Sequence, residues 1–228
     1  MTALTVLVTG ASRGIGAATA LRFAATGARV VRMARSAMPP LAGAVDIRVD
    51  LADPADRRRA LEEASAAAGT PDIIVSNAGA FLLAPLAETT DELLREQLAV
   101  NLEAPLAVAR HFLPAMIARG SGVHVLIGSI ADWHALPGNA AYAASKFGAR
   151  GLHEVLLEEC RDSGVRCTLI SPGATNTAVW DPLDPDRRTD LPNRAEMLCP
   201  DDVAAAIQFA ATQPPNVQIE LIRLGASR

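Results

Sequence analysis

The sequence has few cysteines, few aromatic residues and no excess of positive charge. Its 228 residues include three cysteines with neither a Cys-x-x-Cys pair nor a histidine at a metal-binding spacing, so no disulfide framework or zinc site is indicated. Lys and Arg total 21 against 25 Asp and Glu, and the net charge of −4 has the wrong sign for a nucleic-acid-binding protein. We therefore expect a reducing, cytoplasmic location, no metal and no nucleic-acid partner.

Long hydrophobic runs are also absent. No stretch of 18 or more apolar residues occurs, and the apolar start at Leu4–Val8 lacks the basic region and cleavage site of a signal peptide. Hydrophobic residues still make up 50% of the chain, and a chain of this length can bury a full core without disulfides. These features predict one soluble domain over residues 1–228, without a membrane partner.

Short apolar runs alternate with helical patterns along nearly the whole chain, which is typical of a parallel sheet with helices on both faces. Most of the predicted strands are short, rich in Val, Ile and Leu and without polar alternation, as buried parallel strands are. They cover Thr5–Thr9, Val30–Ala34, Val45–Val49, Ile73–Ser76, Val123–Ile127, Val165–Ile170 and Gln218–Ile222. The predicted helices cover Ile15–Thr26, Ala55–Ala68, Asp91–Arg119, Ala140–Asp162 and Asp201–Ala211. This order predicts an α/β fold with one doubly wound parallel sheet of about seven strands.

Two segments are expected to depart from this regular pattern. The helix over Asp91–Arg119 should bend or restart near Asn101–Pro105, because an internal proline removes a hydrogen bond and clashes with the preceding turn. Residues 174–199 are polar and rich in proline, and loops of this length are usually functional lids or disordered. We predict that this segment is a substrate loop.

Three glycines follow the first predicted strand in the run Thr-Gly-Ala-Ser-Arg-Gly-Ile-Gly over Thr9–Gly16. At such a turn, glycines permit a sharp reversal, a close approach of a pyrophosphate to the backbone and tight packing of helix on strand. The spacing is not the common Gly-x-Gly-x-x-Gly, and a tight turn without a ligand is the alternative interpretation.

The end of the second predicted strand bears on the choice of cofactor. The run Met33–Ser36 contains no carboxylate to accept hydrogen bonds from the 2′-hydroxyl of NAD. Arg35, together with Arg13 from the glycine turn, could pair with the 2′-phosphate of NADP instead. We predict NADP(H) over NAD(H), with a solvated loop arginine as the alternative for Arg35.

The only tyrosine in the chain, Tyr142, stands four residues before Lys146 in a predicted helix. Residues four apart share a helix face, and a nearby ammonium favours phenolate, so the pair could act as an acid/base group. An exposed pair without a role is the alternative. Ser129 follows the fifth predicted strand, where its hydroxyl could either bond a substrate carbonyl or cap a turn.

Together these residues resemble the short-chain dehydrogenase/reductase family in order and spacing over nearly the full length. The matching motifs are Thr9-Gly10-x3-Gly14-x-Gly16, Asp50 after the third strand, Asn77-Ala78-Gly79 after the fourth, Asn101 in the bent helix, Ser129, Tyr142-x3-Lys146, and Pro172-Gly173 followed by Thr177. The resemblance implies a Rossmann-type fold and an NADP(H)-dependent carbonyl reductase that interconverts a secondary alcohol and a ketone or aldehyde.

The resemblance also implies roles for individual residues. Tyr142 would donate the proton, Lys146 would lower its pKa and hold the nicotinamide ribose, Ser129 would orient the carbonyl, and Asn101 would keep a relay water. The residues implied in cofactor binding are Gly10, Ser12, Arg13, Gly14, Ile15, Gly16, Arg35, Ser36, Asp50, Leu51, Asn77, Ala78, Gly79, Tyr142, Lys146, Pro172, Gly173, Thr175 and Thr177.

The substrate is less well defined by the sequence. An apolar pocket wall is expected from Phe81, Leu82, Ile130, Trp133, His134, Leu136 and Trp180. Arg187 and Arg188 could bind a carboxylate, which would favour a 3-hydroxy acid dehydrogenase, but a solvated pair is the alternative.

Two further expectations concern function class and assembly. A non-catalytic NADP(H)-binding sensor or scaffold is the alternative to an enzyme, although its usual mark, loss of a catalytic residue, is missing. The helices predicted over Asp91–Arg119 and Ala140–Asp162 resemble those through which family members associate, so a homotetramer or homodimer is expected.

Overall fold

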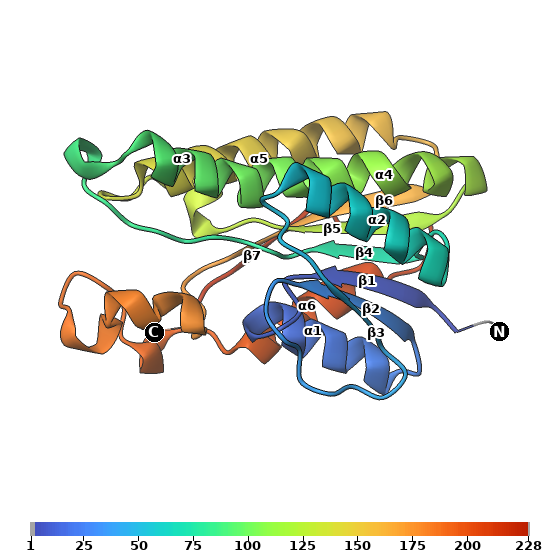
Figure 1. The fold of residues 1–228 in the computed structure, drawn as a ribbon, viewed down its shortest axis with the longest axis horizontal. Coiled ribbons are helices and arrows are strands. Elements are labelled where there is room, and N and C mark those ends of the chain that lie inside the picture. Colours follow the sequence, from blue (N-terminus) through green and yellow to red (C-terminus); the bar gives the residue numbers. More distant parts are fainter. Residues whose placement is uncertain (1–2, 228) are drawn as a thin grey trace.

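The computed structural model describes residues 3–227, and its centre is a sheet of seven parallel strands (Figure 1). The strands are β1 (Thr5–Thr9), β2 (Arg29–Ala34), β3 (Val45–Arg48), β4 (Ile73–Ser76), β5 (Gly122–Ile127), β6 (Val165–Pro172) and β7 (Leu221–Leu224). Their order in space is β3-β2-β1-β4-β5-β6-β7. This arrangement confirms the predicted doubly wound α/β fold, because the strand order reverses between β1 and β4.

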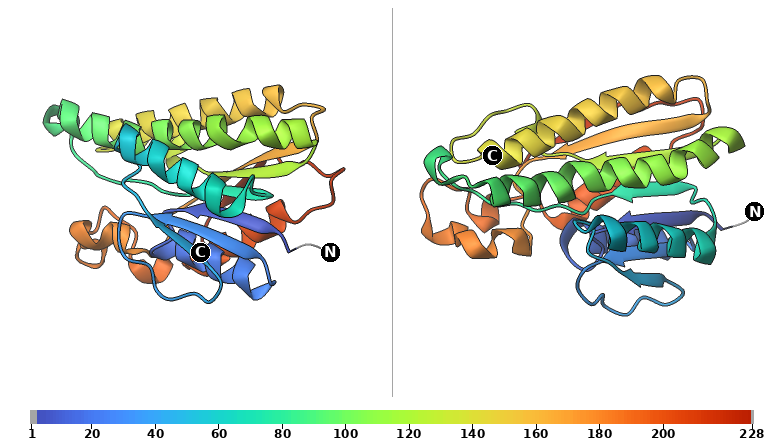
Figure 2. Two further views of the ribbon diagram at one scale, coloured as in Figure 1. Left: turned by 45° about the vertical axis from the view of Figure 1, so that its right-hand side comes forward. Right: turned by 45° about the horizontal axis from the view of Figure 1, so that its top comes forward.

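Helices cover both faces of the sheet, as Figures 1 and 2 show from three directions. One face carries α1 (Gly14–Ala25) and α6 (Pro200–Ala211). The other carries α2 (Pro54–Ala68), α3 (Asp91–Leu98), α4 (Ala104–Arg119) and α5 (Ala140–Glu159). The predicted helices are therefore confirmed, with ends that differ by a few residues and a division of the third helix.

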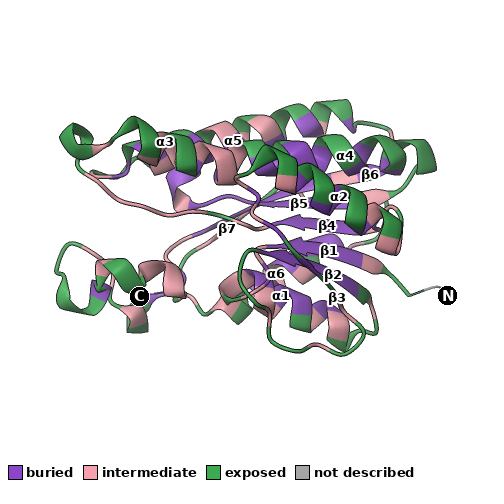
Figure 3. Cartoon of the chain, viewed as in Figure 1, coloured by how far each residue is buried: buried purple, intermediate pink, exposed green. Residues whose placement is uncertain are grey.

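Burial on both faces explains why most strand residues are apolar, with Arg32, His124 and Thr168 as buried exceptions. In β1, Leu7 packs in the core under α2, α4 and α5, whereas Val6 and Val8 pack in the core under α1 and α6. Figure 3 shows the buried strands between helices whose outer faces are exposed. A strand with apolar neighbours above and below has no position for polar alternation.

The expected irregularity in the third helix is a π-helical turn, η2 (Ala99–Glu103), between α3 and α4. Its signature is the hydrogen bond from the amide of Ala104 to the carbonyl of Ala99, five residues back. Pro105 lies in the first turn of α4, where its missing N–H costs little. The interruption near Asn101 is confirmed, but its form is a widened turn rather than a break at the proline.

The last strand is displaced from its predicted position, since β7 begins at Leu221 rather than at Gln218. The side chain of Gln218 donates to the carbonyl of Cys167, and the hydroxyl of Thr168 donates to the carbonyl of Ile219. These side-chain bonds hold the residues before Leu221 beside β6 without a strand ladder.

The segment predicted as a substrate loop, residues 174–199, begins after β6, and its two ends lie close together. Within it lie three short 3-10 turns, η4 (Ala178–Leu183), η5 (Pro185–Arg187) and η6 (Arg194–Glu196). The ends are joined by a bridge between Thr175 and Leu198. Between residues 3 and 227, no helix is both long and apolar enough to cross a bilayer.

Candidate active site

Most predicted cofactor-binding residues come from loops at the carboxyl ends of the strands, whereas Asn101, Tyr142 and Lys146 lie in helical segments. In an open α/β sheet, ligands bind at the crevice where the strand order reverses, which here lies between β1 and β4. The glycine turn, residues 10–16, follows β1, and Asn77–Gly79 follow β4. The topology therefore brings these two predicted motifs to one edge of the sheet.

The glycine turn is tightly constrained at two positions. Gly10 has a φ of +68°, which disfavours other residues, and a Cβ added at Gly16 would lie 2.3 Å from the carbonyl oxygen of Gly10. Arg13, the N-cap residue of α1, makes no side-chain cap, whereas Asp53 and Thr90 cap α2 and α3. The first amides of α1 thus face the crevice edge without a side-chain acceptor, which suits a phosphate group.

Thr9 fastens the glycine turn to the loop after β4. Its hydroxyl oxygen accepts from the amides of Asn77 and Ala78, each at 3.0 Å. The side-chain amide of Asn77 donates in return to the carbonyls of Thr9 at 2.9 Å and Gly10 at 3.3 Å. These four bonds fix the walls of the crevice relative to each other.

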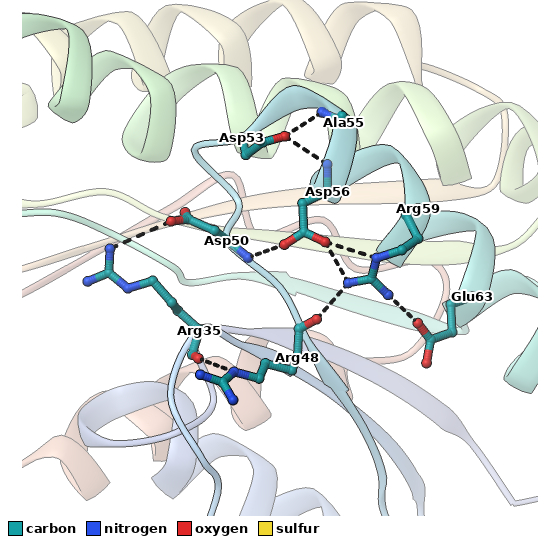
Figure 4. A network of polar contacts seen from close by, with 8 residues as sticks. All are labelled: Arg35, Arg48, Asp50, Asp53, Ala55, Asp56, Arg59 and Glu63. Atoms are coloured by element: carbon teal, nitrogen blue, oxygen red, sulfur yellow. Dashed lines mark hydrogen bonds and ion pairs between the residues drawn. The ribbon is translucent and has the colours of Figure 1, made fainter.

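Residues predicted to select the cofactor lie beside the ends of β2 and β3 (Figure 4). Arg35 is exposed, and its Nη1 lies 3.8 Å from Oδ2 of Asp50. Asp50 is anchored through its backbone amide, which donates to the carboxylate of Asp56 at 2.8 Å. Leu51 is buried, and Ser36 is exposed beside Arg35. Asp50 thus has a fixed backbone, while Arg35 is held only weakly.

The predicted acid/base pair lies on the inner side of α5. The ammonium of Lys146 is buried, donates to the carbonyl of Ile127 at 2.9 Å and lies 5.8 Å from the ring centre of Tyr142. Ser129 lies at the end of β5, before the 3-10 turn η3 (Ile130–Asp132), and its hydroxyl accepts from the amide of Ala131 at 3.2 Å. Neither Tyr142 nor Lys146 is exposed, so the alternative interpretation of an exposed pair without a role does not describe them.

Burial controls the proton affinities of this pair. Desolvation lowers the pKa of Lys146 to about 8. Desolvation raises the pKa of Tyr142 to about 12, although the neighbouring Ser129 hydroxyl acts in the opposite direction. The expected lowering of the phenol pKa by the lysine is not found, because desolvation has the largest effect and the negative charge of Asp132 acts in the same direction. Tyr142 stays protonated near neutral pH and can donate a proton.

Two buried side-chain amides hold the chain after Gly79. Asn101 accepts from the amide of Ala80 and donates to its carbonyl, both at 2.9 Å. Gln97 makes the same pair of bonds to Leu82, both at 3.2 Å. Asn101 also donates to the hydroxyl of Ser145 on α5 at 2.9 Å. Both amide hydrogens of Asn101 are thus used within the protein, so it could hold a relay water only through an oxygen.

The substrate-pocket candidates divide into two groups. The ring of Phe81 packs edge-on against Tyr142 at 4.8 Å and against Trp180 at 4.9 Å between ring centres. Ile130 and Leu82 are half-buried. Trp133, His134 and Leu136 are exposed, and Trp133 stacks with Arg223 at 4.5 Å. Phe81 therefore reaches the predicted catalytic residue and Trp180 packs behind Phe81, whereas within residues 3–227 Trp133 has no ring contact with Phe81, Tyr142 or Trp180.

The residues after β6 return toward the glycine turn. Gly173 donates its amide to the carbonyl of Leu224 at 2.7 Å, and the hydroxyl of Thr175 donates to the carbonyl of Gly173 at 3.1 Å. A Cβ added at Gly14 would lie 3.0 Å from Cγ2 of Thr177. Thr177 thus lies directly over the turn that leads into α1.

Sequence analysis did not single out Gln97 or Asp132, which are both buried among these residues. Asp132 forms a capping box with Ser129, so the pattern Ser-x-x-Asp after a strand was the available signal for it. Gln97 has no comparable signal, because a glutamine in a predicted helix is usually on the exposed face.

Comparison with known proteins identifies the class to which this fold and crevice belong. The family model for short chain dehydrogenases matches residues 4–188. The chain belongs to the short-chain dehydrogenase family of oxidoreductases.

Individual relatives match over nearly the full length. An uncharacterised oxidoreductase of Listeria monocytogenes is 30% identical, with 96% of this chain and 95% of the relative covered. The D-threitol dehydrogenase of Mycolicibacterium smegmatis is 34% identical, with 90% and 85% covered. The solved structure of a metagenomic short-chain oxidoreductase in complex with NADP has a TM-score of 0.81 and 31% identity, covering 99% of this chain and 97% of that chain.

The link between Thr9 and the loop after β4 leads to a stability prediction. Thr9→Val should lower the free energy of unfolding by about 2 kcal/mol or more, because the amides of Asn77 and Ala78 lose their buried acceptor. Thr9→Ser keeps the hydroxyl and should stay close to the wild type. Urea denaturation of the three proteins measures the difference, and equal stability of the Val and Ser variants would contradict the assigned role of the hydroxyl.

Proposed function

We propose that this chain is an NADP(H)-dependent oxidoreductase that interconverts a secondary alcohol and a ketone or aldehyde, with Tyr142 as the general acid/base. The observation that carries the proposal is the placement of the half-buried Tyr142 and the buried Lys146 on one face of α5, beside Ser129. The phenol and the ammonium are both desolvated there, a cost in free energy that proteins usually accept at functional sites.

The residues at the switch point fit a dinucleotide. Gly16 allows an approach that a Cβ would block, the start of α1 lacks a side-chain cap, and Asn77–Gly79 line the other wall. The pyrophosphate would lie at the amides of the glycine turn, the adenine near Asp50 and Leu51, and the nicotinamide near Lys146 and the segment after Pro172. When bound, NADPH supplies the hydride for carbonyl reduction.

The protein supplies the proton and the geometry. The hydroxyl of Ser129 orients the substrate carbonyl, and Oη of Tyr142 donates its proton to the carbonyl oxygen as that oxygen gains negative charge. Because its pKa is raised, Tyr142 begins reduction in the protonated form. Lys146 places a positive charge near the phenolate that remains, and in alcohol oxidation the phenolate would accept the proton back.

The preference for NADP(H) rests on the end of β2. No carboxylate follows Ala34, and Arg35 is exposed there with only a 3.8 Å ion pair to Asp50. Arg35 is therefore available for a 2′-phosphate, with Arg13 on the neighbouring turn. The solved relative in complex with NADP supports the same cofactor.

The pocket favours an apolar substrate. Phe81 packs on Tyr142, and Trp180 packs on the ring of Phe81 from residues 174–199, which we propose as the substrate loop. Arg187 lies 3.4 Å from Asp184, and Arg188 lies 2.6 Å from Asp190. Because each of these arginines already has an acidic neighbour, the 3-hydroxy acid alternative receives no support from them.

We also propose that the chain self-associates through the outer faces of α4 and α5. Leu106 and Ile117 are exposed on α4, three helical turns apart, and Phe147 and Val155 are exposed on α5. An apolar stripe on two neighbouring helices suits a second copy of the same chain in a homodimer or homotetramer. The three free cysteines are compatible with the expected cytoplasmic location.

The mechanism predicts that Tyr142→Phe abolishes turnover. Loss of the proton donor should reduce kcat by about 100-fold or more with NADPH and any carbonyl substrate, while the dissociation constant for NADPH stays nearly unchanged. Steady-state assays over a panel of ketones and aldehydes, combined with fluorescence titration of NADPH, measure both. Wild-type NADPH binding without any turnover would favour the sensor or scaffold instead.

The cofactor proposal predicts a selective effect of Arg35→Ala. The dissociation constant for NADPH should rise about tenfold, because one charge-assisted contact to phosphate is lost, and that for NADH should hardly change. Arg29→Ala, at the opposite end of β2, is the matched control. Equal losses for both cofactors would contradict the role of Arg35.

The assembly proposal predicts a dimer or larger species by light scattering. Replacing Phe147 and Val155 with Ser should shift the protein toward the monomer, because the apolar area of the interface is lost. A wild-type chain that is monomeric at micromolar concentration would contradict the proposal.

A further inference from the structure

Asp132 is a fully buried carboxylate in the wall of the proposed active site. It ends η3, three residues after Ser129. Its Oδ2 accepts from the backbone amide of Ser129 at 3.0 Å and from the hydroxyl of Ser171 at 2.5 Å. Its Oδ1 is buried without a hydrogen-bond partner in the described part of the chain.

Capping alone does not account for this burial. Glu196 and Asp202 form the same kind of capping box at η6 and α6, and both are exposed. Burying a carboxylate costs free energy that only hydrogen bonds and nearby positive charge offset, so a cap is cheaper at the surface. The position of Asp132 therefore reflects a requirement beyond the turn it caps.

The chain also keeps space for this carboxylate. A Cβ added at Gly128 would lie 2.2 Å from Oδ2 of Asp132 and 3.0 Å from the hydroxyl oxygen of Ser171. Glycine directly before Ser129 thus allows Asp132 and Ser171 to meet beneath the backbone. Gly128, Asp132 and Ser171 thus fit together at the contact between the Asp132 carboxylate and the Ser171 hydroxyl.

We propose that Asp132 is a positioning residue of the active site, whose carboxylate joins the backbone of Ser129 to Ser171 and so fixes the catalytic serine relative to the turn at Pro172 and Gly173. This inference rests on the proposed function, because it assigns a role relative to Ser129. The joined segments follow β5 and β6, and the proposed roles require both to keep their places while substrate and cofactor exchange.

The charge of Asp132 gives it a second effect on the site. Its negative charge adds to the raised pKa of Tyr142 and opposes the larger lowering of the Lys146 pKa by desolvation. From β6, Ser171 contributes a neutral hydroxyl, and from β7 the cation Arg223 stacks on the adjacent Trp133. The carboxylate therefore favours the ammonium and the protonated phenol, which is the proton-donating state.

The test compares Asp132→Asn, Ser171→Ala and the double variant with the wild type. Asp132→Asn keeps the shape of the side chain and removes its charge, Ser171→Ala removes one bond and keeps the charge, and Glu158→Gln removes a surface carboxylate as the control. Circular dichroism and thermal unfolding verify that each variant is folded.

Each single variant at positions 132 and 171 should lower kcat at least about tenfold, with a smaller change in KM for the carbonyl substrate. The double variant should be no slower than the slower single variant, because removing the charge weakens, and removing the Ser171 hydroxyl breaks, the same linkage. The high-pH limb of the kcat profile for reduction should move to lower pH in Asp132→Asn only. Wild-type kcat in Ser171→Ala, or an unshifted profile in Asp132→Asn, would overturn the proposal.

A readout without turnover separates this proposal from the function on which it rests. Tyr142 is the only tyrosine, so the phenolate absorbance of the folded protein reports this residue alone. Its onset should occur at lower pH in Asp132→Asn than in the wild type, and should be unchanged in Ser171→Ala and Glu158→Gln. An unchanged onset in Asp132→Asn would overturn the effect of its charge. Absence of wild-type turnover on every carbonyl would count against the proposed function, while this titration would still test Asp132.

Discussion

The constraint on which the rest of this structure depends is a sheet of parallel strands buried on both faces. Parallel strands end at the same edge, so every loop that follows a strand meets the others there. Burial on both faces leaves few polar positions within the strands, and most polar residues of the candidate site therefore lie in or beyond those loops. The four hydrogen bonds between Thr9, Gly10, Asn77 and Ala78 lock the central two loops together.

The same constraint shows why the fold could be predicted. Buried parallel strands are largely apolar, and helices have a different hydrophobic period. The type and order of the elements can therefore be predicted from short stretches of sequence. The start of the last strand was harder to predict. The sequence around Gln218 and Ile219 resembles that of a strand, but these residues are held beside β6 by side-chain hydrogen bonds. The π-helical turn was expected only as an irregularity, since its form depends on what Asn101 contacts across space.

The candidate site was predictable as a set of residues and less so as an electrostatic environment. Spacing placed Tyr142 and Lys146 on one helix face, but only the folded chain shows that Lys146 is buried and Tyr142 half-buried. Burial depends on α3, η2 and η3 packing against α5, which no local pattern encodes. For the same reason, Trp133 and Phe81 were equal candidates in sequence although only Phe81 reaches the tyrosine.

Asn101 and Gln97 act together as substitutes for a neighbouring strand. Each presents one amide group that both donates to and accepts from the backbone of a residue after Gly79, as a peptide in a β-ladder does. Ala80 and Leu82 are held in this way, and the ring of Phe81 between them packs on Tyr142 and Trp180. Residue 81 is therefore a position at which a different side chain would change the surface offered to a substrate without removing any of these four backbone hydrogen bonds.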